Sequence, residues 1–507
     1  MTPGPHTARA GVPPVDFEVL LADSVWARAV PGLVDDAQRW MGELPALRAR
    51  LARSARQLAQ PALHPAGIAR AGEMGGRALL AGVLWATADQ ATATSRRLFA
   101  GEQTDRLQAA VARAERVVRA GGPTYMKLGQ FIATARGILP DEMVDAFSWC
   151  RDEAAPLPAG TARRIVERAY GQPPEAVFDR FDDEPLAAAS IAQVHVARLL
   201  DGTDVVVKVR RPGLQRRFEA DIRALALAAA VAERQWPAAR AANLTGFVEL
   251  FAGLVLEELD FRLEALNMVE IGLAVEHARL EGVRSPRPIP ALVTSRVLVM
   301  ERMSGVRYTD ADQLLGAKVD RRRMLRLGIQ GVLEHTLVYG RFHGDLHAGN
   351  VLVDADGSLS LVDFGIVGRL TATERDSLVR LMIGFATEDV HAQLTAVAEL
   401  GGVPPDADLM SLAAEFAALT PPRGELTLTH RDLVDGLGRV VKVLVRHGFH
   451  LPTELMLFLK NLLYLNGFAA AVAPDTDLLG EIEPIFEHFH RRYAAAMTAI
   501  IDSEDDL

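Results

Sequence analysis

The sequence is poor in cysteine, in positive charge and in long apolar runs. Cys150 is the single cysteine among 507 residues, which excludes an internal disulfide framework and suits a reducing compartment. A net charge of −10 argues against nucleic acid as the main partner. The nearest approach to a membrane span, residues 455–474, is interrupted by Lys460 and two asparagines, which favours a buried helix.

No basic stretch followed by an apolar run stands at the N-terminus, so we expect no signal peptide and a cytoplasmic chain. Peripheral attachment to a membrane surface stays open. The chain is 49% hydrophobic and 24% charged, which is typical of a globular protein with a sizeable core. Its length allows about three domains.

The stretch from His343 to Gly365 is the richest in chemistry. It begins with His-Gly-Asp-Leu-His-Ala-Gly-Asn, passes through a predicted hairpin and ends with Asp-Phe-Gly. Two loops that each present an acidic residue across a hairpin are typical of ATP-dependent phosphotransferases. In that chemistry Asp345 accepts the proton of an attacking hydroxyl, Asn350 holds Mg²⁺, and Asp363 bridges metal and phosphates. Each motif alone is weak evidence; the two at this spacing are strong.

A lysine inside an apolar strand lies upstream. Asp201-Gly202 predicts a type I′ hairpin between two strands within 194–209. Lys208, in the second of them, needs a partner because an unpaired charge is costly there. The equivalent lysine of kinases holds the α- and β-phosphates and a glutamate. Glu258 and Glu264, expected on one helix, are the two candidates for that glutamate.

Where kinases carry a glycine-rich loop, this chain has Ala187-Ala188-Ala189-Ser190. Alanine restricts positive φ and places methyl groups where glycine lets the backbone approach phosphate. We therefore expect the nucleotide to be held differently, and less productively for ordinary γ-phosphoryl transfer. Residues 296–300 predict a strand, and Glu301 to Gly305, with Met303, predict the linker where the adenine edge meets backbone.

The segment after Gly365 is short and lacks Ala-Pro-Glu. Thr371 and Glu374 form a capping box that predicts the start of the next helix only a few residues on. Protein kinases dock peptides on a long segment at this place, so its absence argues against protein substrates.

Helices are predicted for much of the remaining chain. They cover 17–75 with breaks at Pro31, Pro45, Pro61 and Pro65, then 104–118, a helix that begins near Thr124, 218–234, 321–339 and several within 372–500. Residues 1–16 are expected to be disordered. Lys127 and Gln130 share one side of the helix after Thr124, which by itself indicates only a solvated lysine.

Together these features resemble the UbiB/AarF family of atypical kinases over about residues 80–400. The motifs that carry the resemblance are Lys127–Gln130 (K-x-G-Q), the alanine-rich Ala187–Ser190, the segment around Lys208, Glu258–Asp260 (E-x-D) and the two acidic loops. The resemblance implies that Lys127 meets Glu258 over the nucleotide pocket and that Glu264 is the partner of Lys208.

The resemblance also implies the set of site residues and the cofactors, ATP and Mg²⁺. Asp345 is the implied catalytic acid, with Lys208 and Glu264; Asn350 and Asp363 are the implied metal ligands. Implied nucleotide contacts are Lys127, Gln130, Ala187, Ala188, Ala189, Ser190, Lys208, Glu258, Glu301 and Met303. Two departures stand out: the family's H-x-D-P-H-P-G-N lacks both prolines here, and its S-T-R after K-x-G-Q is replaced by Ala133–Arg136.

The implied fold is α+β, two-lobed and kinase-like, with an N-terminal helical extension and a mostly helical C-lobe. The predicted domains are 1–75 (extension), 76–184 (helical segment with K-x-G-Q), 185–300 (N-lobe), 301–500 (C-lobe) and 501–507 (acidic tail). The implied activity is ATP binding and hydrolysis that supports quinone or isoprenoid-lipid metabolism, with lipid or quinone-pathway intermediates or enzymes as partners. Two alternatives stay open: an aminoglycoside- or choline-type phosphotransferase, and a non-catalytic scaffold switched by nucleotide.

Overall fold

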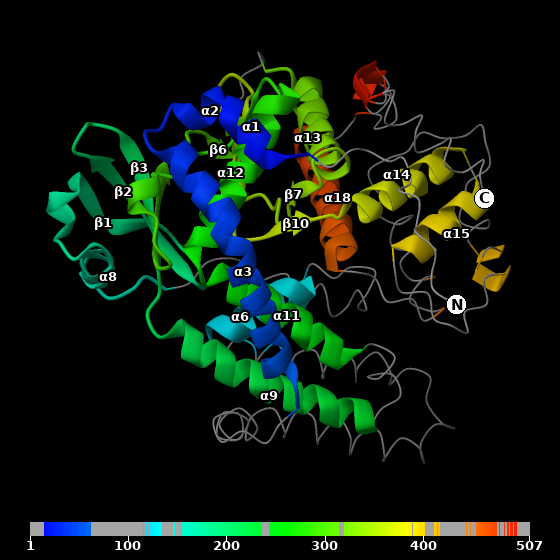
Figure 1. The fold of residues 1–507 in the computed structure, drawn as a ribbon, viewed down its shortest axis with the longest axis horizontal. Coiled ribbons are helices and arrows are strands. Elements are labelled where there is room, and N and C mark those ends of the chain that lie inside the picture. The colour runs from blue at the N-terminus through cyan, green and yellow to red at the C-terminus, as the bar shows by residue number, and fades with distance from the viewer. Residues whose placement is uncertain are drawn as a thin grey trace. The chain divides into compact units, whose positions relative to one another are not determined.

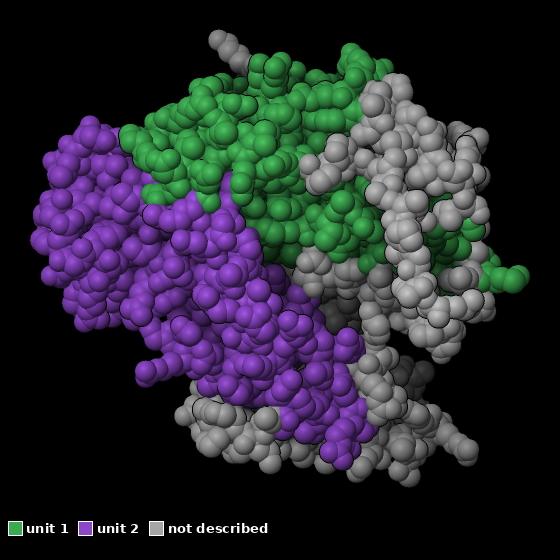
Figure 2. Space-filling model, viewed as in Figure 1, with its two compact units in different colours: residues 1–38, 264–288, 303–507 green, residues 39–263, 289–302 purple. Residues whose placement is uncertain are grey.

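The computed structural model describes residues 15–61, 121–133, 155–235, 243–313, 319–387, 389–400 and 453–473, with isolated positions between 115 and 150 and between 410 and 493. The chain forms two compact units (Figure 2). Unit 1 consists of residues 1–38, 264–288 and 303–507, and unit 2 of residues 39–263 and 289–302. The change from unit 2 to unit 1 after Arg302 falls inside the linker predicted from the sequence.

Unit 2 contains a four-stranded antiparallel sheet in the order β1-β2-β3-β5 (Figure 1). Its strands are β1 (Phe178–Ala188), β2 (Ala192–Leu199), β3 (Asp204–Arg210) and β5 (Val297–Glu301). The side chains of Val205, Val207 and Val209 alternate along β3 and are fully buried, as the two-residue period of a strand requires. They pack with Val166 of helix α8 (Thr161–Tyr170), and Lys208 lies on the opposite face of the strand.

The β2–β3 hairpin is present, but its turn is not type I′. A type I′ turn needs positive φ at both central residues, and only Gly202 has it, at 90°. The Gly202 N–H donates to the Leu199 carbonyl, and the Leu199 N–H to the Thr203 carbonyl. This pattern is a three-residue loop with glycine at the left-handed position. The Asp201 carboxylate accepts from the Thr203 N–H, which favours this turn over the predicted one.

The helices of unit 2 bury a second core. They are the part of α3 (Leu33–Ala59) from residue 39 on, α6 (Pro123–Ala133), α9 (Leu214–Gln235) and α11 (Leu244–Glu258), with the short η1 (Pro174–Ala176) and η2 (Pro290–Leu292). Leu58, Phe218, Ile222 and Phe251 lie in one cluster. The buried Thr124 hydroxyl at the start of α6 donates to Asp221 of α9 at 2.5 Å.

The predicted break at Pro45 is wrong, because α3 continues through it. A proline inside a helix costs about 3 kcal/mol through a lost hydrogen bond and a clash. Buried side chains on both sides of it, among them Trp40, Leu44 and Leu58, offset that cost. The prediction of one helix for Glu258 and Glu264 is also wrong: α11 ends at Glu258, and α12 (Phe261–Ala278) begins after Asp260.

The described part of unit 1 is mostly helical, with two small sheets. Its helices are α1 (Phe17–Asp23), α2 (Val25–Arg28), most of α12, η3 (Tyr308–Gln313), α13 (Arg321–Leu337), α14 (Ala372–Thr387), α15 (Val390–Glu399) and α18 (Thr453–Val472). The sheets are β10 (Val367–Arg369) with β7 (Arg341–His343), and β4 (Val283–Arg284), β9 (Leu359–Leu361), β8 (Val351–Val353) and β6 (Val306–Arg307) in that order. Figure 1 shows α18 beside α13.

Several local predictions are confirmed. The helices predicted at 218–234 and 321–339 correspond to α9 and α13, and the hairpin after the first acidic loop is β8–β9. Thr371 and Glu374 bond reciprocally as a capping box before α14. The buried helix predicted near 455–474 is α18. Among the described residues, no helix is both long and apolar enough to cross a membrane.

Strand β1 was not predicted. It extends through Pro185 and takes up Ala187 and Ala188, so the alanine-rich segment is a strand end and a tight turn rather than a long loop. The helix predicted at 104–118, the tail at 501–507 and the disorder predicted before residue 15 lie outside the described residues, apart from two positions of that helix.

Candidate active site

The loop after β7 holds Asp345 by backbone contacts on both sides. The Asp345 N–H donates to His343 Nδ1 at 3.1 Å, and the His343 Nε2 atom lies 3.1 Å from the Val362 carbonyl oxygen. The Asn350 side-chain amide donates to the Asp345 carbonyl at 2.9 Å. These bonds restrain a loop that lacks the two prolines of the family motif.

The His343 ring is neutral in this arrangement. Burial is the main cause that lowers the pKa of His343 below its usual value. A neutral ring can accept at Nδ1 from Asp345 and donate at Nε2 to Val362 at the same time. The ring also packs against Phe364, with centroids 5.2 Å apart. His343 is therefore a framework residue that links the two acidic loops.

The second acidic loop is bonded to the first. The Gly344 N–H donates to the Ile366 carbonyl at 2.8 Å, and the Val362 N–H donates to the Asn350 carbonyl at 2.9 Å. Asp363 has a φ of +59°, a left-handed conformation that aspartate tolerates better than most residues. Unit 1 thus places Asp345, Asn350 and Asp363, which were adjacent only as motifs in the sequence, on two loops that are tied together.

The donor set of these loops fits a magnesium ion. The side-chain nitrogen of Asn350 donates to the Asp345 carbonyl. The side-chain oxygen of Asn350 is therefore the atom that would bind the metal. An amide oxygen and the Asp363 carboxylate are the hard ligands that Mg²⁺ prefers, with substrate phosphates completing its shell. No group of three or more histidine, cysteine or acidic side chains that could hold a metal occurs among the described residues.

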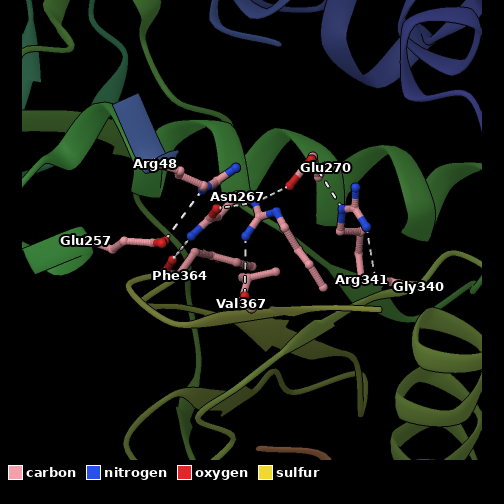
Figure 3. Close-up of polar contacts among 9 residues, drawn as sticks. Arg48, Glu257, Asn267, Glu270, Gly340, Arg341, Phe364 and Val367 are labelled. Atoms are coloured by element: carbon pink, nitrogen blue, oxygen red, sulfur yellow. Dashed lines mark hydrogen bonds and ion pairs between the residues drawn. The ribbon is translucent and has the colours of Figure 1, made fainter. Parts of the chain in front are cut away.

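Helix α12 supports the Asp363 loop from one side (Figure 3). The Asn267 side chain donates to the Phe364 carbonyl at 2.7 Å, and its oxygen accepts from Arg369 at 2.6 Å. Glu270, one turn further along α12, pairs with Arg369 and, at 3.3 Å, with Arg341. The carboxylate therefore joins β10 and β7, the strands on either side of the two loops.

Helix α18 reaches the Asp345 loop with two consecutive residues. The Lys460 Nζ atom lies 2.8 Å from Asp345 Oδ1, and the fully buried Asn461 donates to the His343 carbonyl. His347 is a further basic side chain beside the carboxylate, with its Nε2 3.7 Å from Asp345 Oδ2. Two of the three polar residues that marked this segment as unsuited to a membrane, Lys460 and Asn461, therefore contact the candidate catalytic loop.

In unit 2, Lys208 is buried on β3 and its Nζ lies 5.6 Å from the centre of the Phe261 ring. Glu264 is buried in the first turn of α12, within unit 1. The pairing of Lys208 with Glu264 stays a prediction. Glu301 is the last residue of β5, opposite Val205, and Met303 follows in the linker.

The turn after β1 is held by an arginine that the sequence analysis did not single out. Arg211 donates to the Ala189 carbonyl at 2.8 Å and to the Ala155 carbonyl at 2.7 Å. The Ala189 N–H closes the turn onto the Ala192 carbonyl. The buried Ser190 hydroxyl finds no hydrogen-bond partner in the part of the chain that the structure describes. A buried hydroxyl without a partner fits a ligand that carries acceptor oxygens, such as a phosphate.

The pairing implied for the K-x-G-Q helix is present. Lys127 Nζ of α6 lies 2.9 Å from Glu258 Oε2 at the end of α11, and their side chains are 17% and 10% exposed. Gln130 follows one turn later on α6. Asp260 pairs with Arg262 at the start of α12, and Arg48 of α3 pairs with Glu257 at 3.5 Å (Figure 3).

Sequence reasoning missed Lys460, Asn461, Arg211 and Asn267. Lys460 and Asn461 carried a signal, since polar residues in an apolar helix need partners, but their partners are more than 100 positions away. Arg211 and Asn267 carried none, because both act on backbone carbonyls.

Comparisons with known proteins point to one family of atypical kinases. Residues 150–397 match the model of the ABC1 atypical kinase-like domain. A probable protein kinase UbiB of Pseudomonas paraeruginosa is 32% identical over 73% of this chain and 70% of its own length. A counterpart of the same name in Marinobacter nauticus is 30% identical, over 73% of this chain and 68% of that one.

An uncharacterized aarF domain-containing protein kinase, chloroplastic, of Arabidopsis thaliana is 31% identical over 71% of each chain. Among solved structures, a Mycobacterium tuberculosis protein in complex with erythromycin has a TM-score of 0.46 and 23% identity, over 68% of this chain and 90% of that one. The family match confirms the predicted α+β, kinase-like fold. The chain belongs to the UbiB/AarF family of atypical kinases.

Proposed function

We propose that the chain is an ATP-dependent phosphotransferase or ATPase of the atypical kinase type. One observation carries the proposal: the Asp345 and Asp363 loops are bonded to each other, with Asn350 between them as a second oxygen ligand. Phosphoryl transfer requires a protein to hold a base and metal ligands in fixed positions relative to one another. Positioning and charge stabilisation supply most of the catalysis of this reaction. Family membership supports the same reading.

Each side chain has a distinct role in this proposal. Asp345 accepts the proton of a water molecule or substrate hydroxyl, a contribution typically worth about 10²–10⁴ in rate. Lys208, with Glu264 as its partner, orients the phosphates. Asn350 and Asp363 would hold magnesium, which when bound neutralises phosphate charge. The Ser190 hydroxyl and the turn that Arg211 holds would face the nucleotide.

The substrate class is proposed from the family resemblance. We expect support of quinone or isoprenoid-lipid metabolism, with peripheral contact to a membrane, rather than phosphorylation of proteins. The short connection from Asp363 to α14 agrees with this, because it leaves little chain on which a peptide could dock. An aminoglycoside- or choline-type phosphotransferase is less favoured, since the Lys127–Glu258 pair belongs to the UbiB/AarF pattern.

The alanine-rich turn favours one second candidate, a scaffold that binds nucleotide as a switch. Ala187 and Ala188 are paired into the sheet with β2, so their backbone amides are less able to wrap around phosphates than those of a glycine loop. Such a scaffold would bind ATP normally and hydrolyse it slowly.

The proposal is tested with Asp345→Asn and Lys208→Ala in the full chain. We expect the first to lower ATP hydrolysis by about 10²–10⁴ while Mg-ATP binding persists. We expect the second to weaken Mg-ATP binding, because it removes the cation that meets the phosphates. Titration calorimetry and phosphate release, each with and without lipid vesicles, are the measurements.

Glu281→Gln is the matched control, because Glu281 is exposed and lies outside the site. Unchanged turnover in Asp345→Asn would refute catalysis by this loop. Tight nucleotide binding by the parent chain without turnover in either condition would favour the switch.

A further inference from the structure

The cation beside Asp345 comes from α18, a helix outside the span that matches the family model. That span ends at residue 397, whereas α18 covers Thr453–Val472. Between Phe342 and Gly365 the sequence contains no lysine or arginine. Lys460 therefore places a basic side chain 2.8 Å from Asp345 Oδ1, where the two acidic loops have no lysine or arginine of their own.

The position of Lys460 is fixed by its neighbours on α18. Asn461 donates to the His343 carbonyl and holds the helix against the start of the loop. Tyr464, one turn on, lies with its ring centre 5.5 Å from Lys460 Nζ and 6.2 Å from the His347 ring. Asn461 already anchors α18 to the loop, so an ion pair is not needed for that purpose. The Lys460 side chain is 11% exposed, which makes its attraction to anions stronger than at a solvated surface.

We propose that Lys460 is a further catalytic residue, which contacts the transferred phosphoryl group and orients Asp345; this rests on the proposed function. In the reaction the hydroxyl oxygen forms a bond to the γ-phosphorus, the bond from that phosphorus to the β–γ bridging oxygen breaks, the proton passes to Asp345, and ADP leaves. The attacking hydroxyl is hydrogen-bonded to Asp345, so the phosphoryl oxygens lie within a few ångströms of Lys460. An ammonium group has three donors, and Asp345 uses one of them.

The decisive measurement compares the affinity for MgADP with that for MgADP and fluoroaluminate, which imitates the transferred phosphoryl group. In Lys460→Met we expect MgADP affinity to change less than about threefold and the additional affinity from fluoroaluminate to fall by about 10- to 100-fold. Lys460→Arg should retain most of that gain, because it keeps the charge. Turnover of Lys460→Met should fall by about 10²–10³.

Arg284→Met is the matched control, since it removes a half-exposed arginine that pairs with Asp354 and Asp356 in the same unit. If the role of Lys460 were purely structural, Lys460→Met would have a lower melting temperature and would bind MgADP and MgADP with fluoroaluminate more weakly by the same factor. A labelling experiment on the parent chain needs no variant: fluoroaluminate with MgADP should slow acylation of Lys460 by about tenfold relative to MgADP alone, since a bonded amine is a poorer nucleophile.

The two levels of the proposal fail differently. If the parent chain binds no MgADP, the proposed function falls, and the role of Lys460 with it. If the parent chain binds MgADP and gains affinity with fluoroaluminate, but Lys460→Met keeps the full gain, only the role of Lys460 is wrong. The absence of any gain in the parent chain, or equal labelling in both states, would also overturn it.

Discussion

At the scale of single residues, the most prominent polar contacts are ion pairs between partly buried side chains. Lys127 and Glu258 are each less than one-fifth exposed, and the loss of either would leave the other without its partner at 2.9 Å. Glu270 is likewise a buried charge, and it forms ion pairs with Arg341 and Arg369. Such pairs contribute more to specific geometry than to net stability, because desolvation offsets much of their attraction.

A double-mutant cycle on Lys127 and Glu258 tests their coupling. We expect Lys127→Met and Glu258→Gln to cost stability singly and the double variant to cost less than their sum, with a coupling energy of about 1–2 kcal/mol. Urea unfolding of the four proteins measures it. Arg198 and Asp204, an exposed pair at 2.8 Å, provide the matched cycle, for which we expect about 0–1 kcal/mol. Equal coupling in the two cycles would contradict a special role for the Lys127 pair.

At the scale of elements, α12 and α18 organise the two acidic loops. Glu264, Asn267 and Glu270 are buried at intervals of three along α12, so they lie toward one side of the helix. Asn267 and Glu270 act on the Asp363 loop and its flanking strands. Helix α18, which lies far along the sequence from the Asp345 loop, contacts that loop through Lys460.

Asn267→Leu tests the action of α12 on the metal loop. The variant keeps the branched shape of the side chain but removes the amide that donates to the Phe364 carbonyl, a cost of about 1–3 kcal/mol. We expect the magnesium concentration for half-maximal ATP turnover to rise by about tenfold, because the Asp363 loop is less restrained. A magnesium titration of turnover measures the shift. Glu281→Gln should behave as the parent chain, and an unchanged magnesium requirement in Asn267→Leu would show that α12 does not order the loop.

At the scale of the whole molecule, buried histidines make stability depend on pH. Burial lowers the pKa of His335 to about 4, and burial is also the main cause of the lowered pKa of His343. His335 lines an apolar cavity of about 50 Å³ behind the Asp345 loop, and its Nε2 has no partner among the described residues. Both rings are therefore neutral in the folded chain.

His335→Phe tests the contribution of this histidine. Its pKa is lower folded than unfolded, so the unfolded chain binds more protons below about pH 6.5, and stability is lost as pH falls from there toward about 4. For His335 alone the loss at pH 5 relative to pH 8 is about 2 kcal/mol. Phenylalanine cannot be protonated. In His335→Phe we therefore expect the urea midpoint to fall less between pH 8 and pH 5 than in the parent chain, by the His335 contribution. Replacement of the exposed His391 by glutamine should leave the profile steep, and a steep profile in His335→Phe would show that the ring is accessible to protons when folded.

Most local elements and the candidate site residues could be predicted from the sequence. Period-two and helical patterns placed β3, β5, α9 and α13, and motif spacing named Asp345, Asn350 and Asp363, because these features depend on neighbours in the chain. The sequence analysis gave the wrong type for the turn at Gly202 and predicted a break at Pro45 that α3 does not have. At these two places a side-chain hydrogen bond and tertiary packing outweigh local preference.

The distant residues that contact the candidate site became visible only in the folded chain. Arg211 and Asn267 bond to backbone carbonyls, which every residue has, so no sequence pattern marks their targets. Lys460 was visible as a lysine in an apolar helix, but nothing in its own segment names Asp345 as its partner. A charge in an apolar helix demands a counter-charge; the fold alone determines where that counter-charge lies.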